Sequence, residues 1–362
     1  MKIEWFKPTF WGKEELYVID ALKSTWISDG EYIHRFESEF SKLCQAKHTI
    51  TVNNGTSALH LALLSLDIGP SDEVIVPGYT FAAPANMVKM VGATPVFIDV
   101  DVDTWCIDPK LIEAAITKKT KAIIPVHTYG NVCDMKSIMT VAKKHKLSVI
   151  EDTAEAAFSL FEDKAAGTFG DVGCFSFQAT KTLTMGEGGA IVITDDLLAD
   201  KARLIRNHGM QGKKRYWHYA LGHNFRLTNY QAGLGLAQLE YIQEVARHKD
   251  RVMKAYKMRL EGISGLSFQV FQAEVQPLVW SVALVLDKKC FGEVEQVRSA
   301  LLEKGIETRS GFFPFYDMPI YDAPYLPITD YLSKQIISLP SYTLITEEEI
   351  DYVCEHLIAL RA

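Results

Sequence analysis

Two stretches of the chain place charged residues directly beside apolar runs. In EDTAEAAFSL, residues 151–160, the acidic pair Glu151 and Asp152 ends one such run. In FSFQATKTLTMGEGGAIVIT, Lys181 follows another run, and a glycine-rich turn at residues 186–189 comes next. Moving a carboxylate or an ammonium group out of water costs on the order of several kcal/mol, so such groups are kept only where they are paired, solvated or used. An acid and an amine held in this way are candidates for one binding site.

A third stretch, TVNNGTSALHLAL, has the features of an anion site. Gly55, Thr56 and Ser57 lie between an expected strand and the first turn of an expected helix. Free backbone N–H groups, two hydroxyls and the positive end of the helix dipole can bind a phosphate there. The same residues can also serve only as a helix cap, and the pattern alone leaves both interpretations open.

Taken together, the acid, the amine and the anion site predict pyridoxal phosphate as a cofactor. Its aldehyde needs a lysine for a Schiff base, its ring nitrogen needs an acid to stay protonated, and its phosphate needs an anion site. Lys181 and Asp152 would serve opposite ends of one ring. A metal site is disfavoured, because no second carboxylate or histidine is spaced to complete a ligand set around Asp152.

The composition narrows the class of protein. The 362 residues carry a net charge of −7 and scattered Lys and Arg residues, which argues against a nucleic-acid partner. No apolar run approaches the roughly 18 residues of a membrane helix, and MKIEWFKPTF lacks the features of a secretory leader, so we expect a cytoplasmic protein without a membrane partner. The six cysteines form no C-x-x-C pair and are expected to be reduced core thiols.

Short β-rich runs alternate with helical patterns through the first two thirds of the chain. The seven runs lie at residues 48–52, 73–77, 94–100, 121–127, 147–152, 173–177 and 190–194. Because these runs are apolar without in-out alternation, they predict a mostly parallel seven-stranded sheet covered on both faces, in an α/β domain of residues 1–245. Ligands bind at the carboxyl ends of such strands, where the three motifs fall.

The pattern changes near residue 240. A long charged helix at 238–260, a strand at 278–286 and helices at 293–305 and 347–360 predict a smaller α+β domain of residues 246–362.

The ordered motifs resemble a known family. STWISDGEYIHRFESEF, NNGTSALHLALLSL, VIVPGYTFAAPAN, VIEDTAEA, FSFQATKTLTMGEGG, GHNFRLTNYQAG and ETRSGFFPFYDMPIY are similar, in order, to motifs of the DegT/DnrJ/EryC1/StrS sugar aminotransferases. The resemblance runs nearly end to end. It implies a fold type I pyridoxal phosphate enzyme that moves an amino group, with L-glutamate as donor.

The resemblance also implies roles for individual residues. Lys181 would be the Schiff-base lysine, Asp152 would lie on the pyridinium nitrogen, and Glu155 near the cofactor hydroxyl. Phe81 would stack on the ring. A lysine at 181 disfavours the dehydratase branch of the family, which carries histidine there. The cofactor phosphate would be held by Gly55, Thr56, Ser57 and Ser176, joined by Asn224 and Arg226 of a neighbouring subunit in a homodimer with shared active sites.

Several of these residues have simpler alternatives. Ser176 and Phe81 could be ordinary strand-end and core residues, and Asn224 and Arg226 could cap or salt-bridge a surface helix. Histidines at 127, 208, 218 and 223 are expected to be structural.

The keto acceptor is the least determined feature of the sequence. The family branch that this chain most resembles usually carries histidine where Asn131 and Tyr316 stand, and many members carry it at Gln178. The leading hypothesis is a nucleotide-linked 4-keto-6-deoxyhexose for surface polysaccharide, and the alternatives are a small phosphorylated ketone such as dihydroxyacetone phosphate and a non-catalytic regulatory protein that binds the cofactor. The expected substrate-facing residues are Trp26, Ser28, Gln178, Arg309 and Tyr316.

Overall fold

A seven-stranded sheet forms the centre of the large α/β unit. The computed structural model describes residues 1–212, 214 and 216–362. The strand order is β1-β9-β8-β5-β4-β2-β3, in which only β9 runs antiparallel to its neighbours. This confirms the predicted α/β class with a mostly parallel sheet. The strands are β1 His48–Val52, β2 Glu73–Pro77, β3 Thr94–Ile98, β4 Thr120–Ile123, β5 Ser148–Asp152, β8 Val172–Ser176 and β9 Gly189–Ile193.

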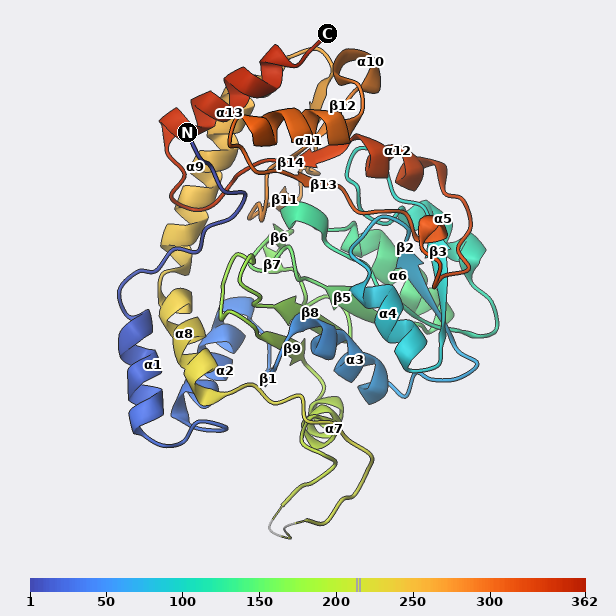
Figure 1. Cartoon of the computed structure of the whole chain (residues 1–362). Helices are drawn as coiled ribbons and strands as arrows, with labels where there is room; N and C mark the ends of the chain where they lie inside the picture. Colours follow the sequence, from blue (N-terminus) through green and yellow to red (C-terminus); the bar gives the residue numbers. More distant parts are fainter. Residues whose placement is uncertain (213, 215) are drawn as a thin grey trace.

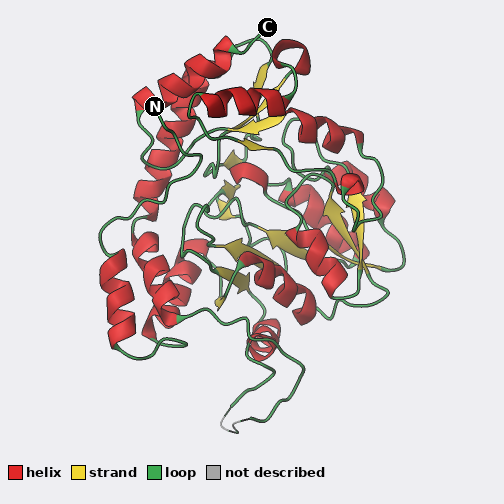
Figure 2. Cartoon of the chain, in the orientation of Figure 1, coloured by secondary structure: helices red, strands yellow, loops and turns green. Residues whose placement is uncertain are grey.

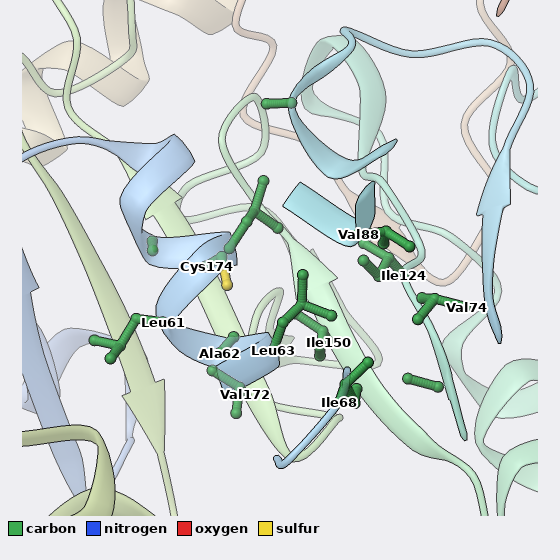
Figure 3. Close-up of a cluster of buried hydrophobic side chains, with 14 of the residues drawn as sticks. Leu61, Ala62, Leu63, Ile68, Val74, Val88, Ile124, Ile150, Val172 and Cys174 are labelled. Carbon is green, nitrogen blue, oxygen red and sulfur yellow. The ribbon is translucent and has the colours of Figure 1, made fainter. Parts of the chain in front are cut away.

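Helix α3, Gly55–Ser65, packs directly on this sheet and is apolar along most of its length. Six of its residues are buried, because the helix lies between the sheet and other helices rather than at the surface. Figure 3 shows this cluster, in which Leu61, Ala62 and Leu63 lie among Ile150, Val172 and Cys174 of the central strands. The position of α3 therefore fixes the position of its N-terminus at the sheet edge.

Further helices surround the sheet (Figure 2), as expected for crossover connections between parallel strands. Several begin with a side-chain cap; Asp134 and Asp195, for example, accept from the backbone three residues on. These elements are α1 Glu14–Lys23, α2 Glu31–Cys44, α4 Ala83–Met90, α5 Pro109–Ala115, η1 Thr128–Gly130, α6 Met135–His145, α7 Asp196–Arg206 and α8 Asn229–Glu240.

A second hydrophobic cluster lies around a four-stranded antiparallel sheet of order β10-β12-β14-β13. Ile3 is fully buried in this cluster and bridges to Ile306, so the start of the chain packs with its last third. The boundary expected at residues 245 and 246 stays a prediction. The elements are α9 Ile242–Leu260, β10 Leu266–Phe268, β12 Ala283–Leu286, α10 Lys288–Phe291, α11 Val294–Glu303, β13 Arg309–Ser310, η2 Phe315–Asp317, α12 Pro327–Gln335, β14 Ile336–Ser338 and α13 Glu347–Ala359.

The prediction of a single uninterrupted helix over residues 238–260 is wrong, because two helices cover this range. The backbone leaves the helical region at Tyr241, so α8 ends at Glu240 and α9 begins at Ile242. The Tyr241 ring stacks on Trp11 with centroids 5.6 Å apart, a contact with the N-terminal segment that periodicity cannot reveal.

Two further features complete the fold. A small three-stranded sheet pairs β11 Val275–Gln276 with β6 Leu160–Phe161, which pairs in turn with β7 Lys164–Ala165. Figure 1 shows the loop after α7 extending well away from the rest of the chain. Within the described residues, no helix is long and apolar enough to cross a membrane.

Candidate active site

A cavity of about 440 Å³ lies at the carboxyl ends of β1, β5 and β8. Such an edge is where open parallel sheets bind their ligands. The three sequence motifs meet here although Gly55 and Lys181 lie 126 residues apart in the chain. Of the residues predicted for the site, Gly55, Thr56, Phe81, Asp152, Glu155, Ser176, Gln178 and Lys181 line the cavity.

The anion site is the N-terminus of α3. Asn54 precedes the helix, and its side-chain oxygen accepts from Ser57 N at 2.8 Å, so the cap is Asn54 rather than the Gly-Thr-Ser motif itself. Ser57 is thus held in the first turn and does not line the cavity. A Cβ atom on Gly55 would lie 2.7 Å from Ser176 Cβ, which is too close for any other residue. Glycine therefore lets β8 and the helix N-terminus approach one another.

Asp152 lies at the end of β5 and is 6% exposed. Its Oδ1 accepts from Ala154 N at 3.0 Å, and within the described part of the chain no donor bonds Oδ2. Burial raises the pKa of Asp152, an effect that the Ala154 N–H and the charge of Lys181 oppose. An incompletely bonded carboxylate in a cavity is suited to a cationic partner supplied by a ligand.

Glu151, the other member of the acidic pair, has a structural role. Its carboxylate accepts from the backbone N–H groups of residues 167, 169 and 170 and from His127 Nε2 at 3.0 Å. His127 Nδ1 accepts from Cys133 N, so the ring proton lies on Nε2. These bonds satisfy the fully buried Glu151, and His127 is structural as expected.

Lys181 points its amine at a second buried acid. Its Nζ lies 3.5 Å from Glu155 Oε1, and the Lys181 side chain is 16% exposed. Glu155 Oε2 accepts from Tyr129 N at 3.0 Å. Tyr129 has φ +56°, a backbone conformation that is uncommon for a bulky residue and that aims its N–H at the carboxylate. Burial raises the pKa of Glu155, and the charge of Lys181 opposes that shift.

Aromatic residues from outside the three sequence motifs complete the cavity. The Trp280 ring lies with its centroid 4.1 Å from Lys181 Nζ, and its Nε1 donates to Thr180 O at 2.6 Å. Trp5 and Phe312 also line the cavity. The sequence predicts a strand at residues 278–286 that includes Trp280, and nothing in that apolar run marks Trp280 as a site residue.

The cavity fits pyridoxal phosphate. The N-terminus of α3, which Gly55 allows to lie close to Ser176, can bind the cofactor phosphate. Asp152 offers a carboxylate with a free oxygen, and Lys181 offers an amine. Phe81 is 62% exposed at the cavity, so its ring face is open to a planar ligand. All three chemical requirements of the cofactor are thus present in one space.

Four predicted residues lie away from this cavity, around the start of α2 and the extended loop. Ser28 and Arg226 line a separate hollow of about 100 Å³. Arg226 Nε donates to Asn224 Oδ1 at 3.0 Å, at the surface. Trp26 is 67% exposed. Within one chain, the structure therefore does not bring Trp26, Ser28, Asn224 and Arg226 to Lys181.

The remaining substrate candidates divide into two kinds. Arg309 lines an adjoining hollow of about 230 Å³ that shares Trp5, Trp280 and Phe312 with the main cavity. Tyr316 lines neither space, and its hydroxyl donates to Asp330. Asn131 is fully buried, and its amide donates to the carbonyls of residues 104 and 270, so it cannot serve as a donor to substrate.

Known proteins are similar to this chain over nearly its whole length. The sequence is 41% identical to GDP-perosamine synthase of Escherichia coli O157:H7, covering 97% of this chain and 96% of the relative. It is 42% identical to GDP-perosamine synthase of Caulobacter vibrioides, with 96% and 95% covered. Among solved structures, Spr1654 from Streptococcus pneumoniae in its PLP form has a TM-score of 0.94 at 27% identity, with 99% and 98% covered.

The fold and the cavity define a fold type I aminotransferase that depends on pyridoxal phosphate. Residues 11–358 match the model of the DegT/DnrJ/EryC1/StrS aminotransferase family, and the chain belongs to that family. The resemblance noted from the motifs is thereby confirmed.

Proposed function

We propose that this enzyme transfers an amino group from L-glutamate to a nucleotide-linked 4-keto-6-deoxyhexose, in the synthesis of a surface polysaccharide of the capsule or lipopolysaccharide kind. The observation that carries the proposal is the 41–42% identity to two GDP-perosamine synthases across at least 96% of this chain. A relationship of that extent includes both the cofactor cavity and the segments around it. Fold alone would not support a substrate, because one fold serves many reactions.

The cofactor would be held by residues of the main cavity. The N-terminus of α3 with Thr56 and Ser176 would bind its phosphate, Phe81 would cover one ring face, and Lys181 would attach it covalently. When bound, pyridoxal phosphate supplies an electron sink for the charge that develops at the donor Cα.

Each charged residue then has a defined task. Asp152, as an anion, would stabilise a proton on the ring nitrogen through an electrostatic contact in a site shielded from water. With the donor bound, the Lys181 amine would take the proton from the donor Cα as a general base and return one as a general acid. Glu155, 3.5 Å from Nζ, would hold the amine near the reacting carbon.

We also propose a homodimer with shared active sites. Asn224 and Arg226 lie at the surface, outside their own chain's cavity, which supports a contribution to the phosphate of a neighbouring subunit. Trp26 and Ser28 lie in the same surface region as Arg226 and would face the neighbour's substrate.

A second acceptor class is favoured by one observation. Asn131 and Tyr316, two of the positions where family members carry histidine, donate to protein oxygens. A diphosphate needs several charge-assisted donors, each contributing about 1.5–3 kcal/mol, whereas a small phosphorylated ketone needs fewer. Membership of an aminotransferase family and the presence of Lys181 argue against the non-catalytic alternative.

An acceptor panel tests the proposal. The enzyme is first converted by L-glutamate, separated from the donor, and offered GDP-, UDP- and dTDP-linked 4-keto-6-deoxyhexoses or dihydroxyacetone phosphate. We expect a nucleotide-linked sugar to restore the visible absorption of the cofactor fastest, with the amino sugar detected by mass spectrometry. Recovery with dihydroxyacetone phosphate alone would refute the nucleotide-sugar assignment and establish the second class. Failure of L-glutamate to convert the enzyme, where another amino acid succeeds, would refute the donor.

A further inference from the structure

Lys249 is a buried lysine outside the cofactor-binding residues. It lies on α9 and is 5% exposed. Its Nζ donates to two backbone carbonyls, Trp280 O at 2.7 Å and Ser341 O at 2.8 Å. Within the described residues, no carboxylate lies within ion-pair distance of Nζ. Burial lowers the pKa of Lys249 to about 7.

The two hydrogen bonds of Lys249 require an amine group but not a positive charge on it. A neutral amine still has two hydrogens, which is enough for two carbonyl acceptors, so both contacts persist in the form that burial favours. A chain that needed only apolar packing at this position would bury a methionine or leucine more cheaply. The two carbonyl groups that accept from the amine therefore explain why a lysine is buried at position 249.

One of those carbonyls belongs to the residue that covers Lys181. The Trp280 ring centroid lies 4.1 Å from Lys181 Nζ, and the indole Nε1 donates to Thr180 O, the carbonyl just before Lys181. Trp280 N donates to Tyr129 O at 3.2 Å, and Tyr129 N donates to Glu155, the acid beside Lys181. A continuous set of contacts thus runs from α9 to the amine.

Lys249 and Lys181 also line one narrow hollow between α9 and the lysine loop. The Trp280 ring is further confined by the edge of Trp5, with centroids 5.8 Å apart, and by the Tyr129 ring at 5.9 Å. The ring can therefore move little unless its backbone moves. The Lys249 bond acts on that backbone.

We infer that Lys249 is a positioning residue for the reaction: its amine fixes the Trp280 carbonyl, and through it the indole that covers Lys181. This inference rests on the proposed role of Lys181 as the residue that attaches the cofactor. Lys249 does not touch the reacting atoms. Its effect is on where the Lys181 amine points and how accessible it is.

The test compares Lys249→Met with Tyr256→Phe. Tyr256 lies on the same helix, is fully buried and donates to Pro340 O, next to Ser341, so its loss weakens the same packing without releasing Trp280. Lys181 is acetylated in the cofactor-free proteins and the rate is followed by mass spectrometry. We expect Lys249→Met to raise that rate at least about threefold and to lower turnover at least about tenfold with little change in donor KM, because alignment rather than binding is lost. Tyr256→Phe should leave all three values near those of the parent.

Two outcomes would overturn the inference. One is a Lys249→Met protein that loses stability but keeps the parent acetylation rate and turnover, as a purely structural lysine would. If Lys249→Met does not fold, Trp280→Phe takes its place, since it removes the bond to Thr180 O while keeping an aromatic ring. A Trp280→Phe protein with the parent acetylation rate and turnover would then reject the positioning role of Lys249. Failure of the Lys181 assignment is distinct, because Lys181→Ala would in that case keep the covalently bound cofactor.

Discussion

Glu151 and Asp152 are neighbours in the chain with opposite surroundings, because successive side chains of a strand point to opposite faces. Glu151 accepts from three backbone N–H groups and a histidine, whereas the Asp152 carboxylate accepts from one backbone N–H in the described part of the chain. The first carboxylate stabilises the fold, and the second is left for a ligand. The acidic pair thus divides structure and chemistry between adjacent residues.

Asp152→Asn should separate these effects. The folded protein raises the pKa of Asp152, so its ionised form costs stability at pH 7, and that cost disappears as the pH falls through the raised value. The cofactor-free variant should therefore be more stable than the parent at pH 7, with a difference that shrinks in acid. With cofactor, turnover should fall at least about a hundredfold.

Urea unfolding at pH 7 and pH 5, together with turnover, checks this expectation. Glu151→Gln is the matched control, because it makes the same chemical change where every oxygen is bonded, and it should destabilise the protein by about 3 kcal/mol or more. An Asp152→Asn protein that is less stable at pH 7, or that keeps the parent turnover, would contradict the role of Asp152.

At the scale of elements, strands were easier to predict than contacts between distant segments. Each of the seven apolar runs overlaps one of the seven strands, because buried parallel strands are continuous apolar segments, although the run at 121–127 extends beyond the end of β4 at Ile123. The break at Tyr241 was missed, since it depends on a partner, Trp11, that is 230 residues away in the chain. The site role of Trp280 was missed for the same reason, since it depends on a contact with Lys181, which is distant in the chain.

Gly55→Ala should weaken cofactor binding, because Gly55 is the first residue of α3 and its substitution would displace the N-terminus of that helix. Its methyl group would lie 2.7 Å from Ser176 Cβ, so the N-terminus of α3 must move away from β8. We expect cofactor affinity, measured by absorbance titration, to fall at least about tenfold, because the phosphate is bound by that terminus.

Gly69→Ala provides the control. A Cβ atom there meets only Val91 O, at 3.7 Å, and the change should alter stability by less than about 0.5 kcal/mol. Equal affinity of Gly55→Ala and the parent for the cofactor would argue that the phosphate lies elsewhere.

At the scale of the molecule, one chain does not gather every predicted residue. Eight predicted residues line the main cavity, while Asn224, Arg226, Trp26 and Ser28 lie at the surface. The segment between α7 and α8 extends from the body (Figure 1). Within it, the side chain of Leu221 is 96% exposed. An exposed apolar side chain on an extended segment supports the proposed contact with a second copy.

Complementation tests the shared site. We expect a solution mass at least twice the 40.6 kDa of one chain. Lys181→Ala and Arg226→Ala should each be inactive or strongly impaired alone, and mixing them with mild unfolding and refolding should restore part of the activity through hybrid dimers. An active monomer in light scattering, or no recovery from stable hybrids, would refute sharing.

The proposed function depends most on Lys181 as the residue that binds the cofactor covalently. Borohydride reduction of the loaded enzyme fixes the cofactor to its lysine, and peptide mass spectrometry then locates it. We expect modification at Lys181, lost together with the visible absorption and all turnover in Lys181→Ala. Modification at Lys249, the other lysine beside Trp280, or retention of absorption and turnover in Lys181→Ala would contradict it.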